Sequence, residues 1–465
     1  MSVAQHAGTK PYRDVEWYSS RSVRLWAWVA IVIPPVFFYL LASRAQSSLP
    51  YLDDYNGPLA FLLEWKQQHG LQHLTEIVTW QHNEYRLVLL NALLGLQYSV
   101  LGHIDLKALA IVGNLFILFL FGALYLVWRR QSSPPGFALL VFVPVSWILF
   151  QLQYASAMDI SMASLQYFPA LLFGILACYF LPSPGRTAAG LAMLCLALST
   201  AGSANGLFLV PIGCVILLQQ KNYARLAGWL VVSGAITFLY FHGYNFHSAT
   251  THADHNVFSS AKHLSAAYSA AFLGSIATVT RPLPAILLGG ALTAVFFLAT
   301  RDRVFQSNPA LYYSAAFILI TAIGVSGLRS DGGLTTALGS RYRIHSTLML
   351  ILMLLYLCGK YQDRIGRWRG GRRTAIVCVS GLILVAFNLK SNLAGYRFLL
   401  MRRAKLETAM LRWEKHEPPE APHALGREDY TMLSDKKGYY EPRGAILSAA
   451  LHEGIYRLPD LPQQH

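Results

Sequence analysis

Long runs of apolar residues recur along most of this 465-residue chain. Each run is about 17–25 residues long, which is the length that a helix needs to cross the hydrocarbon core of a bilayer. Inside lipid the backbone must satisfy its own hydrogen bonds, so these runs are expected to be helices. The composition agrees, because 54% of the residues are hydrophobic and only 13% are charged. The sequence therefore predicts an all-α polytopic membrane protein.

The apolar runs predict about eleven transmembrane helices. Lys and Arg cluster in the short connections on one side, most densely between Lys360 and Arg373, which places that side and the N-terminus in the cytoplasm. The net charge of +15 therefore follows the positive-inside pattern and does not indicate a nucleic-acid-binding face. The predicted spans are 25–43, 107–128, 136–152, 166–181, 187–203, 206–220, 226–242, 282–300, 309–326, 344–359 and 374–390.

An odd number of spans places the C-terminal tail outside, together with the longer polar loops. We expect a transmembrane module, 1–390, and a short extracytoplasmic tail, 391–465, which opens with a basic amphipathic helix on the outer leaflet. The run 87–101 is short for a span and is predicted to be an interfacial helix. A histidine-rich stretch from His242 to His263 is predicted to be a mobile polar lid. The external loops are 44–106, 153–165, 243–281 and 327–343.

Two carboxylates, Asp53 and Asp54, follow the first predicted span. One interpretation is a solvated turn, since Asp and Asn favour turns. The other is a general base with a companion carboxylate that binds a divalent cation, Mg²⁺ or Mn²⁺, or raises the pKa of its neighbour. Charged groups close to the bilayer tend to mark functional sites, which favours the second interpretation.

Four polar side chains, His82, Asn83, Glu84 and Arg86, lie at the start of the predicted interfacial helix. They could cap that helix, with Glu84 near its positive end. Alternatively, they bring a second carboxylate and a cation to the acidic pair. Asp159, in an otherwise uncharged external loop, is a lesser candidate.

The last external loop ends with Arg341, Tyr342 and Arg343 directly before a span. The positive-inside rule disfavours arginine there. Snorkelling to outer-leaflet phosphates is one explanation, and bidentate recognition of a substrate phosphate is the other. The small-residue turn 202–206 indicates close helix packing, with the lining of a cavity as its alternative.

In this order and on this side of the membrane, the motifs resemble those of the GT-C class of glycosyltransferases, which use lipid-linked sugars. The residues that carry the resemblance are Asp53-Asp54, the stretch from His82 to Arg86, and Arg341-Tyr342. The chain looks most like the bacterial members that decorate O-antigen, cell-wall glycan or pilin. Oligosaccharyltransferases of the class have a large C-terminal domain, so the short tail favours transfer of a single sugar.

The resemblance implies a polyprenyl-phosphate-linked donor and inverting transfer to a glycan or protein acceptor in the cell envelope. The enzyme would lie in the bacterial cytoplasmic (inner) membrane with its active site in the periplasm. No cofactor is required, although a divalent cation (Mg or Mn) on Asp53 and Asp54 stays open. The expected roles are general base for Asp53 or Asp54, acceptor orientation or cation binding for Glu84, donor phosphate binding for Arg341, Tyr342, Arg343 and Arg86, and secondary or acceptor contacts for His82, Asn83 and Asp159.

Two other functions remain open from the sequence. An O-antigen polymerase or ligase also has many spans and external arginines, but it generally lacks an acidic pair after the first helix. A lipid-linked-sugar flippase or transporter would place polar groups near the midplane and often shows repeated halves. The predicted spans are nearly free of ionisable residues, and no internal repeat is evident.

Overall fold

The computed structural model describes Tyr18 and residues 20–131, 133–245, 264–366, 370–415 and 441–459. These residues form helices and two isolated bridges, without a strand among them. Nine of the described helices are long and apolar enough to cross a membrane. The prediction of an all-α polytopic membrane protein is therefore confirmed. Most of the predicted histidine-rich lid, from 246 to 263, lies outside the described residues.

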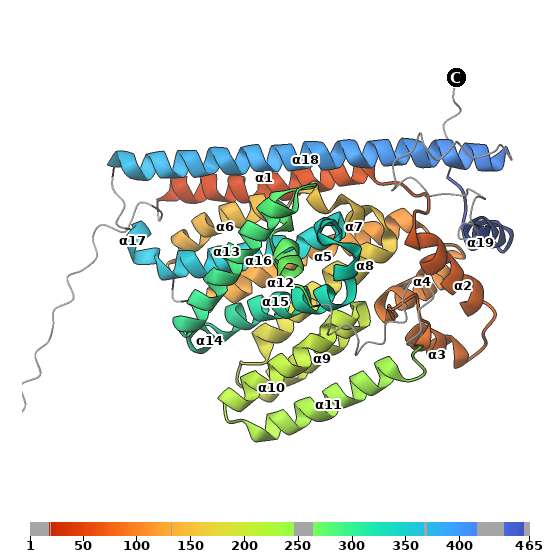
Figure 1. Cartoon of the computed structure of the whole chain (residues 1–465), viewed down its shortest axis with the longest axis horizontal. Helices are drawn as coiled ribbons and strands as arrows, with labels where there is room; N and C mark the ends of the chain where they lie inside the picture. The colour runs from red at the N-terminus through yellow and green to blue at the C-terminus, as the bar shows by residue number, and fades with distance from the viewer. Residues whose placement is uncertain are drawn as a thin grey trace, which may run out of the picture.

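The nine candidate spans are α1 (Arg21–Ala45), α5 (Leu106–Arg129), α6 (Pro135–Leu149) continued by η3 (Leu152–Tyr154) and α7 (Ala155–Asp159), α8 (Ser161–Phe180), α11 (Tyr223–Phe241), α13 (Pro282–Arg301), α15 (Pro309–Arg329), α16 (Arg343–Lys360) and α18 (Gly370–Glu414). They run lengthwise in one elongated bundle (Figure 1). Nearly all side chains of α8 are buried, and it packs against both α5 and α15. α1 and α18 pack together along one face (Figure 1). α8 lies at the centre of the bundle, and it positions several of the polar groups described below.

Two of the predicted spans, 187–203 and 206–220, correspond to shorter helices. α9 (Arg186–Gly202) has 17 residues and α10 (Leu209–Gln219) has 11. Their lengths of about 26 and 17 Å fall below the roughly 30 Å of a hydrocarbon core. Between them the chain turns through η4 (Ala204–Phe208), and residues of this turn line a cavity. Among the described residues, nine helices reach the spanning length and the two that correspond to 187–203 and 206–220 do not, which leaves the predicted number of eleven spans unconfirmed.

The predicted last span, 374–390, is continuous with the predicted amphipathic helix of the tail. Both belong to α18, a single helix of 45 residues. Its length of about 68 Å is more than twice the thickness of a hydrocarbon core. The expectation of a separate helix after residue 390 is wrong, because no proline or turn sequence interrupts the chain before Pro418. One half of α18 therefore extends past the membrane-spanning length.

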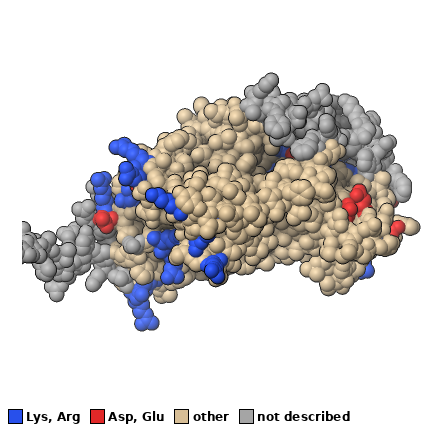
Figure 2. All heavy atoms as spheres, turned by 90° about the horizontal axis from the view of Figure 1, so that it is seen from below, with Lys and Arg blue, Asp and Glu red and all other residues tan. Residues whose placement is uncertain are grey.

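The two ends of the bundle differ in charge. On the face seen in Figure 2, Lys and Arg side chains gather at one end, and Asp and Glu lie mainly at the other. At the basic end, Arg130 Nη2 donates to the carbonyl of Tyr179 at 2.6 Å. In the same region Lys360 Nζ lies 2.5 Å from Asp302 Oδ2. These contacts join the connections that follow α5, α8, α13 and α16, as the clustering of basic residues in the sequence predicts.

The opposite end is built by the first long loop and the end of the chain. Lys66 Nζ pairs with Glu453 Oε2 at 2.7 Å, and the Tyr456 hydroxyl donates to the carbonyl of Ser48 at 2.9 Å.

The predicted helix at 87–101 is present as α4. The shorter helices of the chain are η2 (Tyr55–Leu59), α2 (Ala60–Trp65), α3 (Gln72–Thr79), α4 (Val88–Leu101), α12 (Ala266–Leu273), η6 (Ser275–Ala277), α14 (Val304–Ser307), η7 (Ser330–Gly332), η8 (Leu334–Leu338), η9 (Ser340–Tyr342), α17 (Gln362–Gly366) and α19 (Glu441–His452).

Candidate functional site

A cavity of about 510 Å³ lies at the end of the bundle that carries the first long loop. Its walls come from the turn before α4, the first half of α8, the turn at η4, the ends of α11 and α15, and the start of α16. Most of the lining is aromatic or aliphatic, and it includes Tyr167, Phe208 and Leu328. Glu84 and Arg329 supply the charged groups of the lining. An apolar cavity with a few convergent polar groups is the usual form of a ligand site.

A tight turn at residues 82–85 forms one wall. The N–H of His82 donates to the carbonyl of Tyr85, and the N–H of Tyr85 donates back to His82, both at 2.8 Å. Asn83 has a φ of +50°, a conformation that asparagine tolerates. His82 Nδ1 lies 3.0 Å from the carbonyl of Asn56, which ties the turn to the first loop. α4 begins beyond this turn without a side-chain cap, so the alternative that the cluster caps the helix is wrong.

Glu84 forms an ion pair with Arg329, which lies at the end of α15. Arg329 Nη2 also donates to the hydroxyl of Tyr85 at 3.0 Å. Burial raises the pKa of Tyr85 well above its ordinary value, so its phenol stays protonated. Sequence reasoning did not single out Arg329. A signal existed, because Arg329 shares the loop 327–343 with Arg341, and the sequence predicts this loop to lie on the side where the positive-inside rule disfavours arginine.

Arg341 lies beside the same cavity. Its Cζ is 5.2 Å from the centre of the Tyr342 ring, a cation–π distance. Tyr167 and Arg329 are close enough for their charges to act on its guanidinium. In the part of the chain that the structure describes, this guanidinium has neither an ion pair nor a hydrogen bond. Two arginines thus share one neighbourhood, and Arg341 has no carboxylate paired with it among the described residues, so its guanidinium is available to an anion.

Asp53 and Asp54 have different environments. Asp54 is fully buried, and its Oδ1 accepts from the hydroxyl of Ser161 at 2.6 Å and from the N–H of Met162 at 3.4 Å. Its Oδ2 accepts from the N–H of Tyr51 at 3.2 Å. Asp54 therefore holds the first loop against the positive N-terminal end of α8. Asp53 is half-buried and accepts no hydrogen bond within the described residues, so its carboxylate is the more available of the two.

The stability of the folded protein should depend on whether Asp54 is protonated. Burial raises the pKa of Asp54 to about 7, although the donors of Ser161, Tyr51 and Met162 oppose this shift. An unfolded aspartate titrates near pH ~3.9, so the folded protein binds this proton more tightly and loses stability as pH rises from about 4 to about 7. We expect the melting temperature of the purified protein to fall between pH 5 and 8, and Asp54→Asn to reduce that fall. Asp53→Asn keeps Asp54 but removes a neighbouring charge that helps to raise its pKa, so this variant should reduce the fall less than Asp54→Asn does. Equal slopes in all three proteins would contradict this assignment.

The predicted cation site on Asp53 and Asp54 depends on whether both carboxylates face one point. The oxygens of Asp54 are directed to α8 and to Tyr51, which leaves Asp53 as the available ligand. Among the described residues, no three His, Cys, Asp or Glu side chains lie together. Mg²⁺ requires near-octahedral oxygen coordination, so a cation here would take most ligands from substrate and water. The acidic pair does not fit a two-carboxylate metal site.

Arg86 and Arg343 bind backbone carbonyl groups outside the cavity lining. Arg86 Nη1 donates to the carbonyls of Tyr240 at 2.8 Å and His242 at 2.7 Å, which are orphan acceptors at the end of α11. Arg343 donates to the carbonyls of Gln153 at 3.1 Å and Leu338 at 3.0 Å. Neither arginine belongs to the cavity lining. The structure therefore places these two predicted phosphate ligands behind the cavity lining, with their guanidinium groups bound to backbone carbonyls.

Asp159 forms a buried ion pair that sequence reasoning missed. Its Oδ2 lies 3.5 Å from Arg402 Nη1 on the extended half of α18, and its Oδ1 accepts from the N–H of Ser47 at 3.3 Å. The Arg402 guanidinium also lies 4.2 Å from the ring centre of Tyr51. Asp159 thus joins α18 to the first loop, an environment different from that expected of an acceptor-binding residue. In the sequence Arg402 is one of several basic tail residues, and no sequence pattern identifies Asp159 as its partner.

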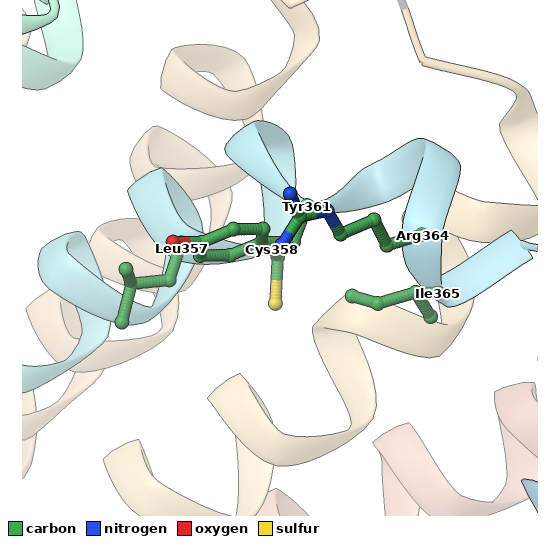
Figure 3. A pocket seen from close by; sticks show the side chains of 5 residues that line it. All are labelled: Leu357, Cys358, Tyr361, Arg364 and Ile365. Carbon is green, nitrogen blue, oxygen red and sulfur yellow. The ribbon is translucent and has the colours of Figure 1, made fainter.

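A second, smaller cavity lies at the basic end. Its volume is about 290 Å³, and all its lining residues come from the end of α16 and from α17 (Figure 3). Its single charged side chain, Arg364, has its Cζ 5.5 Å from the Tyr361 ring centre. No set of polar groups converges here from separate elements, so the larger cavity is the better candidate for a site.

The larger cavity has an apolar wall and is lined by Arg329, while Arg341 lies beside it and the charge of Asp53 acts on Tyr167 in its lining. Such a combination can hold an amphipathic anion and accept a proton beside it. These residues are the basis for inferring function, because no protein-family model matches the sequence and no similar curated protein or solved structure was found.

Proposed function

We propose that the chain is an integral-membrane glycosyltransferase of the GT-C type. It moves a single sugar from a polyprenyl-phosphate donor to a glycan or protein acceptor on the extracytoplasmic side of a bacterial inner membrane. The observation that carries this proposal is the apolar cavity lined by the Glu84–Arg329 ion pair, with Arg341 beside it and not paired with a carboxylate among the described residues.

The donor fits this cavity by its chemistry. The polyprenyl chain would pack against apolar residues of the wall such as Phe208 and Leu328. The phosphate would bind the guanidinium groups of Arg341 and Arg329, since arginine binds phosphate in a bidentate manner. Glu84 fixes Arg329 through their ion pair, which keeps one cation in position before the donor arrives.

The reaction follows from the same groups. Asp53 takes the proton of an acceptor hydroxyl, and the acceptor oxygen attacks the anomeric carbon of the donor sugar. The bond between that carbon and the phosphate oxygen breaks, and its electron pair leaves with the lipid phosphate. Arg341 stabilises the charge that develops on the leaving phosphate. Direct displacement inverts the configuration of the sugar.

The alternatives fit these observations less well. A flippase or transporter places its polar groups near the midplane of the membrane, whereas the charged residues at this cavity lie at one end of the bundle. An O-antigen polymerase or ligase would keep its activity after the loss of Asp53. Localisation in an inner membrane and an extracytoplasmic site are parts of the proposal and rest on the distribution of basic residues.

Transfer by the purified protein tests the proposal. In nanodiscs with radiolabelled polyprenyl-phosphate sugars and an envelope extract as acceptor, the wild type should transfer label. Arg341→Ala should lower the rate by about 10²–10³-fold, the usual effect of losing one group that stabilises the leaving charge. Arg281→Ala removes an exposed arginine before α13 and should leave the rate unchanged. Absence of transfer from every donor would refute the enzyme, and a fully active Arg341→Ala would remove Arg341 from the donor site.

A further inference from the structure

Four side chains of the larger cavity have a buried polar atom without a hydrogen-bond partner in the described structure. They are Gln166 Nε2, Ser203 Oγ, the Tyr342 hydroxyl and His345 Nδ1. Each of these residues is more than nine-tenths buried. Buried polar atoms are nearly always hydrogen-bonded in folded proteins. Because these four atoms belong to side chains that line one cavity, a ligand bound there can supply their partners.

The four residues come from separate parts of the chain and are held in place by aromatic rings. Gln166 lies in α8, Ser203 in the turn before η4, and Tyr342 and His345 at the start of α16. The Phe272 ring lies 5.3 Å from that of Tyr342 and 5.1 Å from that of His345, measured between centres. Residues fixed in this way present their polar atoms without further ordering, which is what a selective binding site requires.

The four groups are alike in that all of them can form hydrogen bonds. An amide, two hydroxyls and an imidazole donate and accept hydrogen bonds, and none of them is a carboxylate, lysine or arginine. The only charged residues in the lining, Glu84 and Arg329, form an ion pair with each other. A ligand with many hydroxyls and no charge matches such a surface. Because Arg329 and Arg341 are assigned to the donor phosphate, a further charged group on the sugar would be buried beside these atoms without a counter-ion, which is costly.

We propose that Gln166, Ser203, Tyr342 and His345 form the subsite for the sugar ring of the donor, and that this subsite selects an uncharged sugar. The inference rests on the proposed function, because it gives the cavity a lipid-linked donor. It goes further by naming the class of sugar and the side chains that select it. A site built to bind hydroxyls discriminates strongly, since a missing partner leaves its buried groups unpaired.

Binding measurements test the subsite without depending on transfer. Three short-chain probes are compared by titration into the protein in nanodiscs: a prenyl-phosphate neutral hexose, the matching prenyl-phosphate uronic acid, and the prenyl phosphate without sugar. The wild type should bind the neutral-hexose probe more tightly than either of the others. Tyr342→Phe and Ser203→Ala remove one hydroxyl each and should weaken binding of the neutral-hexose probe by about tenfold, which is the loss expected for one hydrogen bond. Neither substitution should change the affinity for the sugar-free probe.

Thr200→Val is the matched control. Thr200 Oγ1 is also buried without a partner, but Thr200 does not belong to the cavity lining, so this variant should bind every probe like the wild type. Equal losses for the neutral-hexose and sugar-free probes, no loss for either, or tighter binding of the uronic acid would overturn the subsite. Sugar-dependent binding without any transfer would keep the subsite and refute the enzyme. Failure of all three probes to bind the wild type would refute both.

Discussion

Asp53→Asn should lower the rate of sugar transfer by about 10²–10⁴-fold, the contribution of a positioned general base. The half-buried carboxylate accepts no hydrogen bond within the described residues, so an amide of the same shape removes its basicity and little else. The melting temperature and the affinity for donor should therefore stay close to those of the wild type. Initial rates at saturating donor, measured together with thermal unfolding, check both parts.

Asp54→Asn provides the contrast. Its amide nitrogen would face either the N–H of Tyr51 or the donors of Ser161 and Met162, because all three groups donate to the carboxylate. One donor left unsatisfied costs roughly 1–3 kcal/mol, so this variant should be less stable. Its folded fraction should retain more activity than Asp53→Asn. The opposite ranking of the two folded variants would make Asp54 the base.

The sequence could predict the class of the fold because its signals are lengths and compositions. An apolar run of the right length becomes a helix in lipid whatever its neighbours are, and most of the predicted spans appear among the nine long helices. α9 and α10 were predicted as spans, but the sequence did not show that the chain would turn between them beside the cavity and leave both helices short. The continuity of α18 was missed because the change from apolar to basic residues near 390 was interpreted as a break.

The candidate site could be predicted as a region but not as a set of roles. The sequence places Asp53 and Asp54 side by side, and only the N-terminus of α8 determines that Asp54 is the bound carboxylate. Arginines are similarly ambiguous. Arg86 and Arg341 both lie in polar motifs that the sequence predicts to be external, yet one is bound by carbonyl groups at the end of α11 and the other lies beside the cavity. Long-range contacts of this kind leave no periodic signal in the chain.

Arg402→Ala should produce the largest loss of stability, about 3–5 kcal/mol, because it leaves the Asp159 carboxylate buried and unpaired. The double variant Asp159→Asn, Arg402→Met removes both charges and should recover most of this loss, since a buried ion pair can be replaced by neutral groups at little cost. Equilibrium unfolding in detergent measures the four members of this cycle.

Arg403→Ala is the control for the loss of a neighbouring arginine on the same helix. Arg403 pairs with Glu407 one turn further along α18, but its side chain is 42% exposed, so its removal should cost less than about 1 kcal/mol. If Arg402→Ala cost no more than this control, α18 would not be fixed through Asp159. The loss of Arg402 should affect the site as well, because Arg402 lies against Tyr51, whose N–H binds Asp54. Folded Arg402→Ala protein should therefore transfer sugar more slowly at unchanged donor affinity. The proposed base, Asp53, follows Tyr51 and precedes Asp54 in the chain, so it is held less firmly, while the cavity stays intact.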